Sequence, residues 1–233
     1  MSDPNVFDRY ASTFTDTVNA AIRASGEAAD FFARLKAHLV RRALGTSSPG
    51  TILDFGCGVG NATRALVEAF PSARVIGCDD SRDSVKAARQ AAESGSGRLD
   101  FIVHDGHGLP LEDSSVDVAF ASCVFHHIDP PGQAPWLCEL RRVLRVRAPL
   151  FVFEHNPYNP LTLRVVRTCP FDAGVQLLRP AYARQIIRSA GFRVDRPRYY
   201  FFFPHALRRM RPLEAYMDWL PLGGQYYVVG WRE

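Results

Sequence analysis

The chain has 233 residues, 47% of them apolar and 22% charged, a composition typical of one globular domain large enough to bury a core. Its formal net charge of +4 is smaller than a dedicated nucleic-acid-binding domain usually carries, so a nucleic-acid partner is not expected. The five cysteines form no C-x-x-C pair, which argues against a disulfide framework or a cysteine zinc site and predicts a reduced, cytoplasmic setting. No signal-peptide pattern and no apolar stretch of membrane-spanning length is present, so no membrane partner is expected.

Two amphipathic helices are predicted at the start of the chain. The first runs from Val6 to Ile22, Ser25-Gly26 breaks it, and the second runs from Ala28 to Leu44. Their apolar stripes indicate a helical cap that packs on the rest of the fold.

A glycine-rich turn follows at Asp54-Phe-Gly-Cys-Gly-Val-Gly60, between a short buried strand and a helix over 61–70. A turn of this kind presents backbone N–H groups to a nucleotide-like ligand, and its glycines allow close approach. A dinucleotide fingerprint starting at Gly56 would need glycine at position 61, where Asn61 stands. Asp54 would also repel a pyrophosphate, and it suits a ligand with an ammonium group. An NAD-dependent oxidoreductase is therefore disfavoured.

This motif resembles the first motif of class I S-adenosylmethionine-dependent methyltransferases, in their small-molecule (UbiE-like) branch. The resemblance implies an α/β fold, a doubly wound Rossmann-like seven-stranded sheet whose last strand is antiparallel. It also implies S-adenosyl-L-methionine as the cofactor.

Two further acids stand where the second and third strands should end. Asp79 closes the strand 74–79, where a carboxylate can accept from both ribose hydroxyls, while Asp80-Ser81 could cap the helix 82–92. Asp105, after the strand 99–103, resembles the family position that accepts from the adenine amino group. The residues expected to bind the cofactor are Asp54, Gly56, Cys57, Gly58, Asp79, Asp80, Asp105, Gly106 and Ser122.

The strand 116–121 leads into a pair of histidines, His126 and His127, in a run similar to one that ends this strand in many small-molecule methyltransferases. Neighbours in an extended chain point to opposite faces, so one of the two should face the cleft. We expect this to be His127, as the catalytic base or as the residue that orients the acceptor. The alternative is that both histidines only pack or form hydrogen bonds. Two adjacent histidines in a loop at a sheet end have no convincing ligand geometry, so no metal is expected.

The strand 150–154 should deliver Glu154 and His155 to the same edge as further catalytic candidates. A helix is predicted over 136–146. Residues 157–180 are interrupted by prolines and lie where resembling enzymes place a substrate-facing segment. A helix over 181–190, a strand over 192–203, a helix over 206–219 and a strand over 225–231 complete the chain. The residues expected to contact the substrate are Tyr10, Phe14, His126, Asn156 and Tyr158.

The sequence thus predicts one methyltransferase domain over 1–233, with a helical lid (1–45), a cofactor-binding core (50–155), and a substrate-facing segment followed by antiparallel strands (156–233). The expected partner is a small-molecule methyl acceptor. The chain is expected to be a monomer or a homodimer. Two other readings stay open: a tRNA or protein methyltransferase, with phosphates met by Arg208, Arg209 and Arg211, and a module that binds the cofactor without catalysis.

Overall fold

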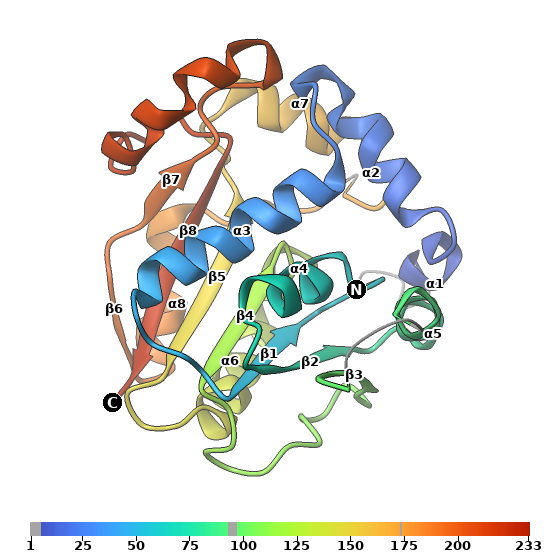
Figure 1. The fold of residues 1–233 in the computed structure, drawn as a ribbon, viewed down its shortest axis with the longest axis vertical. Helices are drawn as coiled ribbons and strands as arrows, with labels where there is room; N and C mark the ends of the chain where they lie inside the picture. The colour runs from blue at the N-terminus through green and yellow to red at the C-terminus, as the bar shows by residue number, and fades with distance from the viewer. Residues whose placement is uncertain (1–5, 93–96, 173) are drawn as a thin grey trace.

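One mixed sheet of eight strands organises the computed structural model, which describes residues 6–92, 97–172 and 174–233 (Figure 1). The strand order is β3-β2-β1-β4-β5-β8-β6, and β7 also pairs with β8. The strands are β1 (Thr51–Phe55), β2 (Arg74–Asp79), β3 (Leu99–Val103), β4 (Val118–Ser122), β5 (Pro149–His155), β6 (Phe192–Val194), β7 (Arg198–Tyr200) and β8 (Gln225–Arg232).

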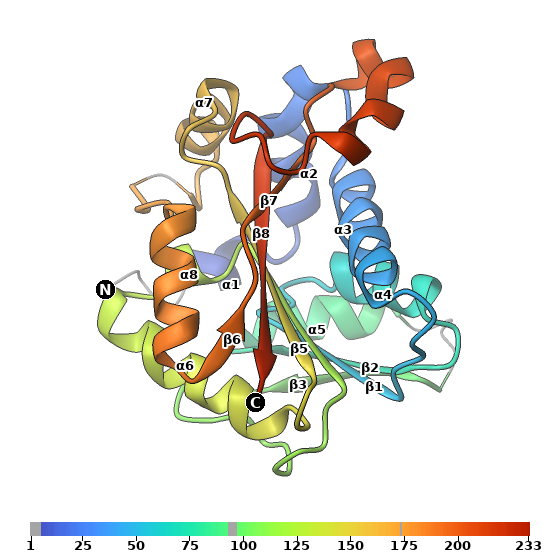
Figure 2. The same ribbon diagram turned by 90° about the vertical axis from the view of Figure 1, so that its left-hand side faces the viewer.

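Helices cover both faces of this sheet, as Figure 2 shows with the sheet seen nearly edge-on. Successive residues of a strand face opposite ways. Leu53 therefore packs in the core under the helices 130–143 and 180–189, and Ile52 in the core under the helices 29–44 and 61–69. Burial on both faces explains why the central strands are continuous apolar runs. The helices are α1 (Val6–Tyr10), α2 (Phe14–Ile22), η1 (Arg23–Ser25), α3 (Ala29–Leu44), α4 (Asn61–Ala69), α5 (Arg82–Ala91), η2 (Phe125–His127), α6 (Pro130–Val143), α7 (Pro160–Thr168), α8 (Pro180–Ser189) and η3 (His205–Tyr216).

The antiparallel strand β8 lies between β5 and β6, and it pairs with both β6 and β7 along one side. The predicted strand over 192–203 is thus two short strands that share one position of the sheet. Pro197 stands between them, and proline cannot donate a hydrogen bond to the neighbouring strand. The prediction of a seven-stranded sheet with an antiparallel last strand is confirmed, with one position occupied by two pieces.

Several helix boundaries differ from the predicted ones. Helix α6 begins at Pro130 and not at Trp136, because proline suits the first helical position. The stretch 157–180, for which the sequence analysis names no helix, contains α7, whose first N–H groups are capped by the side chain of Asn159. The predicted helix over 206–219 is the 3₁₀ helix η3.

The helices α1, α2, α7 and η3 lie beyond the carboxyl end of the parallel strands, at the top and right of Figure 1. Within the described part of the chain, no helix combines the length and the apolar character needed to cross a membrane.

Candidate functional site

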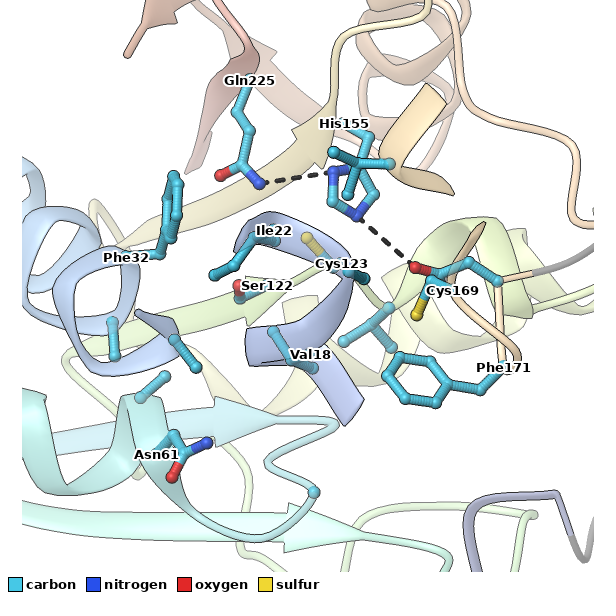
Figure 3. Close-up of a pocket in the computed structure, with 18 of the residues that line it drawn as sticks. Val18, Ile22, Phe32, Asn61, Ser122, Cys123, His155, Cys169, Phe171 and Gln225 are labelled. Carbon is cyan, nitrogen blue, oxygen red and sulfur yellow. Dashed lines mark hydrogen bonds and ion pairs between the residues drawn. The ribbon is translucent and has the colours of Figure 1, made fainter. Parts of the chain in front are cut away.

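A cavity of about 530 Å³ opens at the carboxyl edge of β1, β2, β4 and β5, which is where open α/β sheets bind their ligands. Its floor comes from the turns that follow these strands, and its walls from α1, α2, α3 and α7. Figure 3 shows Val18, Ile22 and Phe32 from these helices, with Cys169 and Phe171 from the loop after α7, around the polar ends of β4, β5 and β8. Its volume is in the range of small-molecule sites.

The glycines of the turn after β1 have different tasks. Gly56 has a φ of +71°, and a Cβ there would lie 2.4 Å from a methyl carbon of Val124, so this glycine is needed for packing. Gly58, at φ +51°, lines the cavity, and a Cβ there would meet nothing within 4 Å. A Cβ at Gly60 would lie 2.7 Å from the ring of Phe101, so among the three glycines of this turn it is Gly58 that keeps room for a ligand against the backbone.

Two buried acids, Asp54 and Asp79, lie beside this turn and line the cavity. Asp79 accepts the backbone N–H of Gly58 at 2.7 Å and that of Ser81 at 3.0 Å, and Asp54 accepts the hydroxyl of Thr63 at 2.7 Å. Burial raises the pKa of Asp54 to about 7 and that of Asp79 to about 6, although these hydrogen bonds oppose the shift. Carboxylates held in this way favour a ligand that carries positive charge or hydroxyl donors.

Asp80 and Ser122 also line the cavity, together with Cys57. Asp105 and Gly106, the predicted adenine contacts, do not line the cavity. Asp105 is exposed and accepts the N–H of His107 at 2.9 Å. Their neighbour His104 lines the cavity instead. It is buried beside Phe55 and Trp136, and burial lowers its pKa.

His126 and His127 lie in the helical turn η2, so the predicted alternation along an extended chain does not apply to them. His127 nevertheless lines the cavity with 14% of its side chain exposed, whereas the side chain of His126 is fully buried beneath it. The Nδ1 atom of His126 lies 2.5 Å from Glu154 Oε2, and Glu154 Oε1 accepts the N–H of Phe125 at 3.0 Å.

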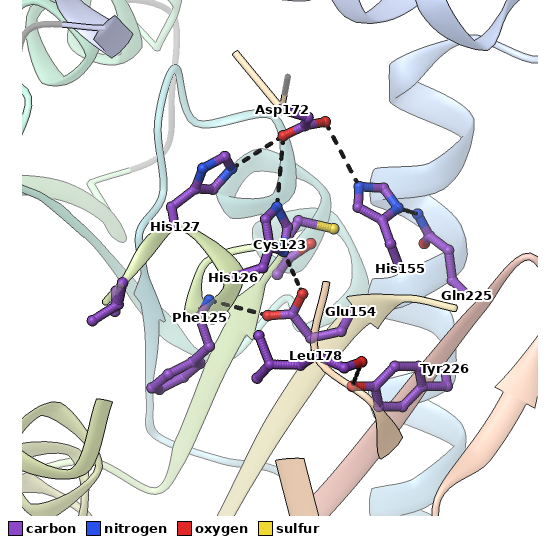
Figure 4. A network of polar contacts seen from close by, with 12 residues as sticks. Cys123, Phe125, His126, His127, Glu154, His155, Asp172, Leu178, Gln225 and Tyr226 are labelled. Atoms are coloured by element: carbon purple, nitrogen blue, oxygen red, sulfur yellow. Dashed lines mark hydrogen bonds and ion pairs between the residues drawn. The ribbon is translucent and has the colours of Figure 1, made fainter. Parts of the chain in front are cut away.

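Asp172, in the loop after α7, brings the two histidines of η2 together with the histidine at the end of β5 (Figure 4). Its Oδ1 atom lies 3.1 Å from His127 Nε2 and 3.6 Å from His126 Nε2, and its Oδ2 atom 4.0 Å from His155 Nε2. Burial would raise the pKa of Asp172, but the surrounding histidines hold it well below its usual range. Burial likewise opposes a charge on His126, yet Glu154 and Asp172 raise its pKa to about 10.

A second polar group gathers around Cys123, directly after β4. The ammonium group of Lys36, a buried residue of α3, donates to Ser122 Oγ at 2.6 Å and to Cys123 Sγ at 3.6 Å. Burial alone would raise the pKa of the Cys123 thiol, but His155 and Lys36 lower it to about 6. The Nδ1 atom of His155 lies 3.3 Å from the side-chain amide of Gln225.

The structure places several other predicted site residues outside the cavity. Glu154 is fully buried beneath it, and Asn156 donates to the carbonyl groups of Pro221 and Gly223, where it braces the loop before β8. Tyr158 is 52% exposed on the surface. Tyr10 does not line the cavity either.

Phe14 does line the cavity, where it stacks on Phe171 with ring centroids 4.9 Å apart. The prediction that 1–45 form a lid extends over residues 1–5, which lie outside the described part of the chain. Asp172 and Lys36 were missed in the sequence because neither stands in a recognisable motif, and only packing brings them to the sheet edge.

Comparison with known proteins agrees with this geometry. A family model described as a methyltransferase domain matches residues 52–147, from β1 to the turn before β5. The chain contains a class I S-adenosylmethionine-dependent methyltransferase domain. The match favours this family over the oxidoreductase alternative.

Two relatives of this methyltransferase domain are named for small-molecule reactions. The trans-aconitate 2-methyltransferase of Azoarcus sp. (strain BH72) is 35% identical over 136 residues, 58% of this chain and 50% of that protein. The demethylmenaquinone methyltransferase of Thermotoga maritima is 30% identical over 112 residues, 48% of this chain and 46% of that protein. The chain therefore spans about half the length of these two relatives.

Among solved structures, the methyltransferase in a complex with the Trm112 methyltransferase activator of Haloferax volcanii has a TM-score of 0.68 to this chain. It is 22% identical, with 97% of each chain covered, so this likeness shows the fold alone.

The residues present in the methyltransferase domain fit its cofactor, S-adenosylmethionine. The open backbone at Gly58 leaves space for it, Asp79 and Asp80 offer acceptors for hydroxyl groups, and Asp54 offers a partner for positive charge.

Proposed function

We propose that the chain transfers a methyl group from S-adenosylmethionine to a small, largely apolar acceptor. The observation that supports this is one continuous cavity with two different ends. The glycine turn and its acids form one end of the cavity, and His127, His155 and Asp172 form the other. Phenylalanines from α1, from α2 and from the loop before η3 form a wall beside the second end.

The cofactor, when bound, supplies a methyl group that is already activated on a sulfonium ion. The chain's own residues then have to hold the acceptor in line and exclude water. Phe14 and Phe171 suit an apolar body, and His127 lies where it can contact the nucleophilic group of the acceptor. That His127 removes a proton from the acceptor stays a prediction from the sequence.

Binding of S-adenosylhomocysteine, the product form of the cofactor, tests the first half of this proposal. Calorimetry should show binding of S-adenosylhomocysteine and none of NAD. Asp79→Ala should weaken binding by about 2–4 kcal/mol, since it removes charge-assisted hydrogen bonds. Asp100→Ala, which removes an exposed acid paired with Arg74, is the matched control and should change nothing. Equal affinity of Asp79→Ala and the original chain would contradict the assignment.

Methyl transfer tests the second half. The chain is incubated with methyl-labelled cofactor and with aromatic and aliphatic acceptors that carry a hydroxyl, a carboxylate or an amine, and in parallel with bulk tRNA and with protein. Label in the small molecules supports the proposal. Label in tRNA or protein alone would favour the macromolecular alternative, and binding without any transfer would favour the non-catalytic one.

A further inference from the structure

Three potential metal ligands converge at the acceptor end of the cavity. One ring nitrogen of His126, one of His127 and one oxygen of Asp172 all lie within 4.8 Å of one another. They come from the turn after β4 and from the loop after α7, and Figure 4 shows the two rings directed at the carboxylate. The sequence predicted no metal, because two adjacent histidines alone offer no convincing ligand geometry. Asp172 supplies the ligand that was missing.

The buried ring of His126 lies between two carboxylates. Its Nδ1 atom lies 2.5 Å from Glu154 Oε2, and because a carboxylate can only accept, Nδ1 carries a proton. The other nitrogen, Nε2, is buried and has no hydrogen-bond partner among the described residues. It points at Asp172, a second acceptor, from 3.6 Å. The two carboxylates favour positive charge at this place, and a metal ion between Nε2 and Asp172 would supply it instead of a second proton on the ring.

The distance from His126 to Asp172 suits a metal ion better than a proton. A proton shared between nitrogen and oxygen gives a separation of about 2.7–3.2 Å, shorter than the 3.6 Å found for His126. Ligand atoms at about 2.0–2.2 Å from a tetrahedral ion lie roughly 3.3–3.6 Å apart. The 3.6 Å from Asp172 Oδ1 to His126 Nε2 lies within this range. The 3.1 Å from the same oxygen to His127 Nε2 is a hydrogen-bond distance, and it would lengthen by a few tenths of an ångström when an ion binds.

We propose that His126, His127 and Asp172 bind a divalent transition-metal ion of the Zn²⁺ type. Two imidazole nitrogens and one carboxylate are ligands for zinc and its first-row neighbours, whereas Mg²⁺ and Ca²⁺ prefer oxygen alone. Glu154 would hold His126 in the ligating tautomer, as carboxylates commonly do behind metal-bound histidines.

The consequence for catalysis rests on the proposed function. His127 and Asp172 line the cavity, so a fourth coordination position would be open to the acceptor. A hydroxyl that occupies this position loses its proton to water more readily because the ion stabilises the resulting anion. The metal would then activate the acceptor without proton removal by His127.

Zinc retention by the full chain tests the site. The chain is stripped with a chelator, incubated with ZnCl₂, passed through gel filtration, and analysed for metal. We expect one zinc per chain, and at least tenfold weaker binding in Asp172→Asn and in His127→Gln. The matched control is His38→Gln, which removes an exposed histidine of α3 and should retain zinc like the original chain. Co²⁺ provides a second readout, since its visible absorption should be lost in the same two variants.

Circular dichroism establishes whether each variant is folded. If Asp172→Asn unfolds, His127→Gln, which changes a residue at the cavity wall, still tests the site. No zinc retained by the folded original chain would overturn the proposal, as would equal retention by a folded His127→Gln or Asp172→Asn variant. Calorimetry with S-adenosylhomocysteine separates this from the proposed function. Cofactor binding without zinc retention would reject the metal site alone, and zinc retention without cofactor binding would reject the methyltransferase proposal alone.

Discussion

The carboxyl group of Asp54 is 1% exposed and has no cation within hydrogen-bond distance among the described residues. Its pKa is raised from 3.8 to about 7, first of all by burial. A group whose pKa is higher in the folded state contributes stability that is present below its unfolded pKa and is lost as the pH rises to the folded pKa. Asp54 therefore costs stability in the chain without cofactor at neutral pH.

We predict that Asp54→Asn becomes more stable than the original chain as the pH rises from about 4 to about 7. The difference should reach on the order of a few kcal/mol, because one pKa unit corresponds to about 1.4 kcal/mol. Urea unfolding at a series of pH values, without cofactor, measures it. A difference that stays constant with pH would show that the raised pKa of Asp54 is not the cause.

Cys123 is predicted to be a reactive thiol. Burial opposes a charge on this thiol, but His155 and, to a smaller extent, Lys36 lower its pKa to about 6, so a thiolate should be present at neutral pH. Iodoacetamide should label Cys123 at a rate that rises through pH 6, and Lys36→Met should move this rise to higher pH. Peptide mass spectrometry follows the labelling, with the exposed Cys138 as internal reference. Identical profiles for the two chains would contradict the role of Lys36.

At the scale of single elements, the turn after β1 separates packing from binding. Gly58→Ala places a methyl group in the cavity at some cost from its positive φ, whereas Gly56→Ala forces one against Val124. We predict that Gly58→Ala weakens S-adenosylhomocysteine binding at least tenfold with about 1–2 kcal/mol of destabilisation. Gly56→Ala should destabilise the fold more. Calorimetry and thermal unfolding test the pair, and a Gly58→Ala variant with normal affinity would move the cofactor away from this turn.

Helices α1 and α2 close the cavity without belonging to the core. The described side chains of α2 include none that is fully buried, while α3 buries Ala33, Ala37 and Val40 under the sheet. Phe7 of α1 lies edge-on to His127 at 5.0 Å, and Asp8 accepts the hydroxyl of Ser81 at 2.5 Å. These contacts hold α1 between the acceptor end of the cavity, at His127, and the cofactor end, near Ser81.

We therefore predict that deletion of residues 1–24 leaves a folded chain that has lost methyl transfer. The apolar acceptor would lose one wall, and water would reach the site. Circular dichroism and the labelled-cofactor assay measure the two properties. Full activity of the shortened chain with its acceptor would show that these helices are no lid.

For the whole molecule, the sequence predicted the sheet well and the site in part. Strands that are buried on both faces can be recognised in the sequence as continuous apolar runs. The motif around Gly58 indicates which end of the sheet binds a ligand. The break at Pro197 and the start of α7 were missed although the sequence carries a signal for each, a proline within a strand and the capping pair Asn159-Pro160. Asp172 was missed for a different reason: its neighbours in sequence carry no periodic pattern, and only the packed loop brings it to His127.

The position of β8 between β5 and β6 has a consequence for biosynthesis. On the ribosome, β5 is complete well before β8, since residues 156–224 have to be made in between. At roughly 5–20 residues per second, a segment of about 70 residues takes on the order of 4–14 s. During that interval one edge of β5 has no partner, and an unpaired apolar strand is prone to join another chain. β8 therefore has two effects. It completes the acceptor end of the cavity, and it covers the edge of β5 that could otherwise pair with another chain.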